Sequence, residues 1–172
     1  LSYTISNEHQ MFEICSETVG LSVYNDPKEV NAGSIVQINM RDFNAVEKYN
    51  FLKENNYNTH YGGVCIFEYI YFLNPNTTWD NLSVKKIRED WAITLAQIDV
   101  HNNAFNQKNE YIVIGIPSTG IQPGQSYAKY LNIEYKQAII KNTNINRTFI
   151  LTKEERDQAS KKKYIYDTDM IN

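Results

Sequence analysis

The sequence predicts an α/β fold in which a parallel sheet with flanking helices is preceded by a few β-strands. A continuous apolar run at residues 111–116 is typical of a strand that is buried on both faces of a parallel sheet. Apolar side chains recur with a helical period over residues 83–98. Earlier in the chain, Val36, Ile38 and Met40 alternate with polar residues, which is the period-2 pattern of a half-buried strand.

The first forty residues are predicted to be β-structure, with a turn at residues 31–33 before the alternating strand. Residues 41–62 are polar and have no period, so they predict a boundary segment. Gly62 and Gly63 then precede a strand that we predict at Val64–Phe72, because this segment is rich in β-branched and aromatic residues.

A helix is predicted at Ser83–Ile98, and its apolar face comprises Val84, Ile87, Trp91, Leu95 and Ile98. It is followed by a strand at Tyr111–Ile116, a tight loop at Pro117–Gly120, a short helix at Gln125–Leu131 and a strand at Ile133–Ile140. Strand, loop, helix and strand within about thirty residues make one βαβ unit.

The last part of the chain is predicted to be helical. Thr152 and Glu155 have the spacing of a capping box, which opens a charged helix that runs to about Lys163. A polar loop at residues 141–146 precedes it, and residues 164–172 have no clear period.

Length and charge limit the function. The chain has 172 residues, 42% hydrophobic and 22% charged, which indicates one globular domain or one domain plus a piece of another. Its formal net charge of −3 argues against a nucleic-acid partner, and no apolar run approaches the roughly 18 residues of a membrane span. Because the sequence opens at Leu1, we expect a processed chain or a part of a longer one.

Cysteine and histidine usage argues against disulfide and metal sites. Cys15 and Cys65 do not make a disulfide framework, and they predict two free thiols in a reducing, intracellular compartment, cytoplasmic or organellar. His9, His60 and His101 are far apart and lack metal-ligand spacing, so no metal site is expected.

Two loops are candidate binding sites. Loop 117–120 follows a buried strand and precedes a helix, the position at which parallel sheets bind ligands. Its small residues expose successive N–H groups that can hold a phosphate, although a plain turn fits equally well. Loop 141–147 carries Lys141 and Arg147, two cations that suit a phosphorylated ligand or simply solvate a surface loop.

Three segments in order resemble the amidophosphoribosyltransferase family, also called glutamine phosphoribosylpyrophosphate amidotransferase. Residues 65–72, Cys-Ile-Phe-Glu-Tyr-Ile-Tyr-Phe, resemble the start of its phosphoribosyltransferase domain. Ile114–Gly120 resembles its pyrophosphate loop, and Lys141–Ile150 resembles its mobile flag loop. The resemblance covers about residues 64–163, and residues 30–38 more weakly resemble the end of the family's glutaminase domain.

The resemblance implies an incomplete type I phosphoribosyltransferase-like sheet, with a remnant of a glutaminase-like domain at 1–45, a linker at 46–63 and a partial phosphoribosyltransferase-like domain at 64–172. The family makes phosphoribosylamine in purine biosynthesis, from glutamine-derived ammonia and phosphoribosylpyrophosphate, with Mg²⁺ on the pyrophosphate. The resemblance assigns a vestigial pyrophosphate loop to Pro117, Ser118, Thr119 and Gly120. It assigns a flag loop to Lys141, Asn142, Arg147 and Thr148.

The sequence departs from the family at the glutaminase nucleophile. That nucleophile is an N-terminal cysteine whose own amine acts as the base. Leu1 stands first here, and neither Cys15 nor Cys65 is placed for that role. The resemblance therefore supplies no catalytic residue in this chain.

The phosphoribosyltransferase motifs depart as well. Ser118 stands where the pyrophosphate loop usually carries an acidic residue. Thr143, Asn144 and Asn146 replace the Arg, Tyr and Gly of the flag loop. The paired-aspartate motif that holds the ribose is absent, because Asp167–Asp169 has neither the preceding buried strand nor the following Gly-Thr-Thr loop.

These departures lead us to predict a non-catalytic subunit with a structural or interaction role in a larger assembly and no cofactor of its own. The alternative is a part of an active amidophosphoribosyltransferase whose remainder lies outside these residues, and which would use Mg²⁺. A third interpretation is a regulatory module that binds a phosphate ester without turnover.

The partner expected from the sequence is another protein. Without the paired-aspartate strand, Tyr111–Ile116 would lack its second neighbour in the sheet, and an open edge exposes unpaired N–H and C=O groups. We therefore expect other protein subunits, or residues 164–172 of this chain, to cover the edge at 111–116.

Overall fold

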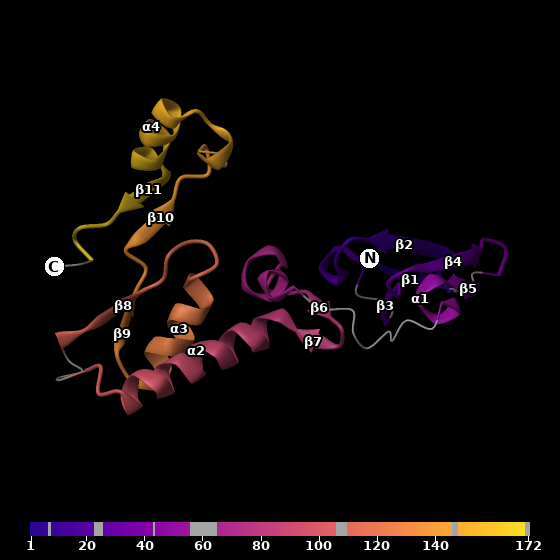
Figure 1. Cartoon of the computed structure of the whole chain (residues 1–172), viewed down its shortest axis with the longest axis horizontal. Coiled ribbons are helices and arrows are strands. Elements are labelled where there is room, and N and C mark those ends of the chain that lie inside the picture. Colours follow the sequence, from indigo (N-terminus) through magenta and orange to yellow (C-terminus); the bar gives the residue numbers. More distant parts are fainter. Residues whose placement is uncertain are drawn as a thin grey trace. The chain divides into compact units, whose positions relative to one another are not determined.

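The computed structural model describes residues 1–6, 8–22, 26–42, 44–55, 65–105, 110–145 and 148–170. Some residues used in the sequence predictions therefore lie outside the described residues, namely Gly62, Gly63, Val64, Asn146 and Arg147. The chain forms two compact units, Leu1–Ile87 and Arg88–Asn172, which are described separately below (Figure 1).

The first unit begins with a three-stranded antiparallel sheet of order β2–β1–β3. Its strands are β1 (Ser2–Ser6), β2 (Met11–Cys15) and β3 (Lys28–Glu29), and the 3-10 helix η1 (Thr18–Gly20) follows β2. The central strand β1 is almost entirely buried. These strands confirm the β-structure predicted for this part of the chain.

A second antiparallel pair, β4 (Ser34–Asn39) and β5 (Asn44–Asn50), leads into the short helix α1 (Phe51–Glu54). Along β4 half-buried and exposed residues alternate, as predicted for Val36 and Ile38, whereas Met40 lies beyond the strand and is 61% exposed. Residues 44–54 of the predicted boundary segment, which has no period in the sequence, thus form regular structure. Polar side chains suit β5 because it lies on an exposed hairpin, where pairing with β4 fixes its register.

The Glu47 carboxylate stabilises this hairpin. It accepts hydrogen bonds from the side chains of Ser34, Asn31 at 3.1 Å and Asn50 at 3.2 Å, and it forms an ion pair with Lys53 at 3.2 Å. These donors, Ser34 foremost, lower the pKa of Glu47 to about 2.

The strand predicted at Val64–Phe72 is also wrong. Residues 66–67 are helical and Glu68–Phe72 form a π-helix, η3. Of this helix Tyr69 alone is buried, and it packs on Trp79 with ring centroids 5.3 Å apart and donates to the Trp79 carbonyl at 3.1 Å. Residues with high strand propensity form a strand only where a neighbouring strand is available to pair with them. In the described part of the chain no strand pairs with residues 65–72. A tight pair, β6 (Thr78–Trp79) and β7 (Leu82–Ser83), follows.

The long helix α2 (Val84–His101) confirms the predicted helix and extends it by three residues. The buried face differs from the one predicted. Besides Val84, the buried residues are Arg88, Ala92 and Ala96. The predicted core residues Trp91, Leu95 and Ile98 are exposed.

The second unit contains the predicted βαβ unit. β8 (Ile112–Ile114) runs parallel to β9 (Glu134–Lys136), and α3 (Ile121–Leu131) connects them. α3 begins four residues earlier than predicted, and it ends at Asn132, whose left-handed φ of 56° terminates the helix. The core of the unit is Ala96, Leu131 and Ile133, with Phe105, Val113 and Tyr127 packed against it.

The strand predicted at Ile133–Ile140 is divided, because β9 is followed by a separate strand, β10 (Ile139–Lys141). β10 pairs antiparallel with β11 (Tyr164–Tyr166), a strand in the tail that showed no period in the sequence. Between them lie the 3-10 helix η5 (Thr148–Ile150) and α4 (Lys153–Lys163), whose predicted Thr152–Glu155 capping box is confirmed. The whole is a mixed α/β structure with a small parallel sheet and several antiparallel pairs, so the predicted fold class is confirmed in outline.

Candidate functional site

The loop between β8 and α3 is the strongest candidate site, because it lies where the strands of a parallel sheet end and a helix begins. The peptide bond between Pro117 and Ser118 is cis. The Gly120 N–H donates to the Ile116 carbonyl at 2.9 Å, and the Ile121 N–H donates to the Ser118 carbonyl at 3.4 Å. These two bonds satisfy the backbone N–H groups of Gly120 and Ile121. The N–H groups of Ser118 and Thr119 have no hydrogen-bond acceptor among the described residues.

Glycines allow this loop to be tight. A Cβ atom at Gly115 would lie 2.7 Å from the Gly120 carbonyl oxygen and 2.7 Å from the Tyr135 hydroxyl oxygen. A Cβ atom at Gly120 would lie 2.7 Å from the Ile116 carbonyl oxygen. Any side chain at either position would therefore displace the loop.

Tyr135 and Gln137, which follow α3 in the sequence, form a hydrogen-bonded group next to the loop. The Tyr135 hydroxyl donates to Gln137 Oε1, and Gln137 Nε2 donates to the Ile139 carbonyl at 2.8 Å and, more distantly, to the Gly115 carbonyl at 3.5 Å. Burial raises the pKa of Tyr135 above its ordinary value. The sequence analysis missed both residues, although their spacing of two along the predicted strand could have placed them on one face.

Helix α3 is held in place by two polar contacts with α2. Tyr127 donates to Asp99 Oδ2 at 2.5 Å, and Gln122 Nε2 donates to Glu89 Oε1 at 3.0 Å. Burial, together with the neighbouring Asp99 carboxylate, raises the pKa of Tyr127 to about 12. Because Gln122 lies in the first turn of α3, these contacts also fix the helix end that follows the loop.

Lys141 and Asn142, which were predicted to belong to a flag loop, are held at the junction of β10 and α4. Lys141 ends β10 opposite Tyr164. The Asn142 N–H donates to the Lys163 carbonyl at 2.9 Å, and its side-chain amide donates to the Lys162 carbonyl at 3.2 Å. Figure 1 shows β10, β11 and α4 continuing beyond the end of β9. The segment is thus fastened to the C-terminal end of α4.

The two predicted loops make no polar contact with each other in the described part of the chain, in which no hydrogen bond or ion pair joins Pro117–Gly120 to Lys141 or Asn142. Thr148 begins η5, and Arg147 lies outside the described residues. The candidate site, in the residues that the structure describes, therefore consists of the amides of Ser118 and Thr119.

Metal binding receives no support from the described residues, in which no group of three or more His, Cys, Asp or Glu side chains could hold a metal ion. Within the same residues, no helix is long and apolar enough to cross a membrane.

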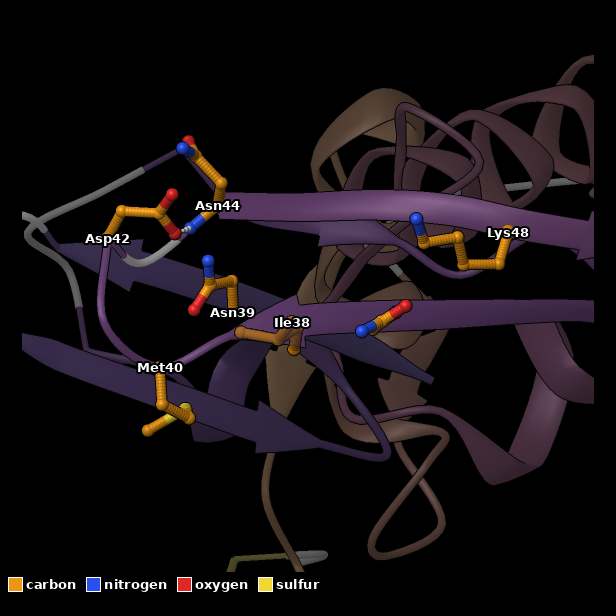
Figure 2. A pocket seen from close by; sticks show the side chains of 7 residues that line it. Ile38, Asn39, Met40, Asp42, Asn44 and Lys48 are labelled. Atoms are coloured by element: carbon orange, nitrogen blue, oxygen red, sulfur yellow. Dashed lines mark hydrogen bonds between the residues drawn. The ribbon is translucent and has the colours of Figure 1, made fainter.

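A second hollow, of about 450 Å³, lies at the tip of the β4–β5 hairpin. Figure 2 shows the seven side chains that line it, namely those of Gln37, Ile38, Asn39, Met40, Asp42, Asn44 and Lys48. Asp42 and Asn39 accept backbone N–H bonds from Asn44 and Arg41 and so shape the turn. All of the lining residues except the half-buried Ile38 are exposed, so the hollow offers a solvated surface and no buried polar group.

No protein-family model matches the chain. Among curated proteins, the amidophosphoribosyltransferase of Archaeoglobus fulgidus is 36% identical over 88 residues, which are 51% of this chain and 18% of that enzyme. The amidophosphoribosyltransferase of Methanothermobacter thermautotrophicus is 29% identical over 153 residues, and that of Staphylococcus aureus is 28% identical over 164 residues. These last two matches cover 87% and 92% of this chain but 29% and 30% of the enzymes.

Two solved structures have a similar fold. One is the glutamine phosphoribosylpyrophosphate amidotransferase from B. subtilis complexed with ADP and GMP, with a TM-score of 0.51 and 24% identity over 78% of this chain and 26% of that one. The other, described as the allosteric regulatory enzyme of purine biosynthesis, has a TM-score of 0.52 and 24% identity over 80% of this chain and 27% of that one. The chain thus spans less than a third of the length of each of these relatives.

Proposed function

We propose that this chain, a distant homologue of part of the amidophosphoribosyltransferases, is a non-catalytic subunit with a structural or interaction role in a larger assembly. The observation that carries the proposal is the incomplete parallel sheet of the second unit. β8 and β9 have three residues each, and β8 has no second partner strand among the described residues.

A two-stranded parallel sheet has low stability on its own. Parallel sheets are normally covered on both faces, and an isolated strand pair is marginal in water. The strand residues of β8 are half-buried here, and Ile116 just beyond them is 61% exposed. Covering an isoleucine fully contributes about 1.5–3 kcal/mol, which favours a bound neighbour at this edge.

The C-terminal tail is engaged elsewhere. Tyr164–Tyr166 pair with β10, and the Asp167 N–H donates to the Ala138 carbonyl at 2.9 Å. This pairing argues against residues 164–167 as the cover of β8. We therefore propose that another protein subunit covers residues 111–116, by adding a strand to the sheet.

The candidate site also supports a non-catalytic role. We expect the amides of Ser118 and Thr119 to bind an anion only weakly. Lys141 and Asn142 are held at the β10–α4 junction and, among the described residues, make no hydrogen bond to this loop. We place the protein inside the cell, as its two free thiols and its relatives suggest.

The second candidate is a part of an active amidophosphoribosyltransferase of purine biosynthesis that binds phosphoribosylpyrophosphate. The loop itself favours it, since Gly115 and Gly120 permit a tight turn whose two free amides lie at the end of β8. In that case the remaining machinery lies outside these residues, and Mg²⁺ arrives with the pyrophosphate.

Calorimetric titration of the protein, purified within its assembly from the source cells, with phosphoribosylpyrophosphate in MgCl₂ separates the two candidates. The non-catalytic proposal predicts no saturable heat. Low-micromolar binding that disappears when EDTA removes the metal would support the enzyme instead.

A further inference from the structure

We infer that a hollow in the first unit, lined by residues of β1, η1, η3 and β6, binds a small free primary amine as its ammonium ion. The hollow has a volume of about 170 Å³, and the described residues that line it all belong to Leu1–Ile87. It is separate from the loop at 117–120, and the inference does not depend on the proposed function.

Two glutamates give the hollow a negative charge. Glu17 and Glu68 both line it and are half-buried. The described residues that line the hollow include no lysine, arginine or histidine. A partly buried carboxylate interacts with an opposite charge more strongly than an exposed one, because water and salt screen the interaction less. The two carboxylates therefore favour a cation over an anion or a neutral molecule.

Hydrogen bonds hold the Glu17 carboxylate in place through one of its two oxygens. Oε2 of Glu17 accepts the backbone N–H of Asn74 at 2.8 Å and the hydroxyl of Thr77 at 2.7 Å. Thr77 is 2% exposed, so this contact is shielded from water. Among the described residues, Oε1 of Glu17 and the Glu68 carboxylate accept no hydrogen bond, so a ligand can bind to them.

Ser2 indicates independently that the hollow binds a polar group. It lines the hollow and is 3% exposed, yet its hydroxyl makes no hydrogen bond to another described residue. Buried hydroxyls normally have a hydrogen-bond partner, because losing water without replacing it is costly. A ligand that carries several N–H donors would satisfy this hydroxyl and the two carboxylates together.

A primary ammonium group matches these three side chains, because it has three N–H donors and no acceptor. Trp79 also lines the hollow, and the face of an indole ring attracts a cation. Leu73 provides apolar surface for a short alkyl chain. Because sites for drug-sized ligands measure roughly 300–1,000 Å³, a hollow of this smaller size suits a small free amine with about four carbons.

The walls of the hollow are joined to each other without a ligand. The Thr18 hydroxyl donates to the Thr78 carbonyl at 3.0 Å and accepts the Thr78 N–H at 2.9 Å. The Trp79 ring packs on the buried Tyr69, with ring centroids 5.3 Å apart. The amine would therefore enter a site that is already formed, which lowers the entropy cost of binding.

Saturation-transfer difference NMR, which detects weak ligands of large assemblies, tests the inference. The protein would be purified within its assembly from the source cells and titrated with n-butylamine near neutral pH in phosphate buffer, which contains no amine. We expect saturable binding with a dissociation constant of about 1 mM, which is reasonable for so small a ligand. n-Butanol, which has the same size but no charge, should give no saturable signal.

Glu68→Gln and the control Glu8→Gln would be introduced into the protein's own gene. Glu8 is exposed and is not among the described residues that line the hollow. We expect Glu68→Gln to raise the dissociation constant of n-butylamine at least tenfold and Glu8→Gln to leave it unchanged. Glu17→Gln, whose amide oxygen can still accept the bonds from Asn74 and Thr77, is the second variant and should act like Glu68→Gln. Equal constants in all three variants would overturn the inference.

Two further ligands complete the test. Nα-acetyllysine amide carries the same four-carbon ammonium group on a peptide backbone, and we expect it to bind more weakly than n-butylamine. Binding at least as tight would assign the hollow to a lysine of a partner protein and overturn the free amine. An n-butanol signal equal to that of n-butylamine would also overturn the inference, since it would show that charge is not recognised. The proposed subunit role stands in each case.

Discussion

Replacing Gly115 by alanine tests whether the loop after β8 is built as described. The new Cβ atom would lie 2.7 Å from the Gly120 carbonyl oxygen, roughly 0.7 Å inside ordinary van der Waals contact, and 2.8 Å from the Ile121 Cα. Both obstacles are backbone atoms, so no side chain can rotate away. Overpacking of this kind typically costs about 1–3 kcal/mol, and we expect Gly115→Ala to lose that much local stability.

Gly124→Ala is the matched control in the same contact patch. Its Cβ atom would lie 3.3 Å from the Gly115 Cα and from Tyr135 Cε2, which needs a shift of a few tenths of an ångström. Alanine also gains about 0.5–1 kcal/mol over glycine inside a helix such as α3. The two effects oppose each other, so we expect a net change within about 1 kcal/mol of zero.

Amide hydrogen exchange measured on peptides from residues 110–136 reports the local opening free energy of this unit. We expect exchange about 5- to 150-fold faster in Gly115→Ala, and close to the unmodified rate in Gly124→Ala. Equal exchange in the two variants would refute the close packing of Gly115 against the loop and α3.

Three further predictions concern single interactions. The folded pKa of Glu47, about 2, is below its ordinary value of 4.5, so its contribution to hairpin stability should be complete above pH 4.5 and be lost as the pH falls toward 2. Thermal unfolding from pH 2 to 6 should show that slope, and Glu47→Gln should flatten it. Asp99→Asn should lower the pKa of Tyr127 from about 12, because a charge that opposes tyrosinate is removed, and absorbance titration of the phenol measures this. Thr152→Ala should destabilise α4 by about 1 kcal/mol through loss of its cap, seen as faster amide exchange in residues 153–156 but not in α2.

The elements that sequence reasoning located correctly are those with local determinants. The apolar run at 111–116, the helical period of 83–98 and the Thr152–Glu155 capping box each specify their element within one segment. The tight turn at 117–120 follows from its small residues in the same way. These features need no distant partner to form.

The elements that were wrong depend on contacts from elsewhere. Residues 65–72 have strand composition, but a strand needs a neighbour, and Tyr69 instead packs on Trp79 in a helical turn. β5 was missed because its pairing with β4 stabilises a polar segment.

The same limit applies to α2 and to the site. The period located the helix, but the buried face was decided by the small Ala92 and Ala96, which admit α3. Gln137 was missed because its hydrogen bond to the Gly115 carbonyl joins residues that are 22 apart in the sequence, and Tyr135, which donates to Gln137, was missed with it.

Hydrogen exchange of residues 111–116 can be compared between the purified chain and the chain within its assembly from the source cells. We predict rapid exchange at the open edge of β8 in the purified chain and strong protection in the assembly, where a partner strand is bound. A soluble monomer in which these amides already exchange slowly, even after residues 164–172 are deleted, would contradict it.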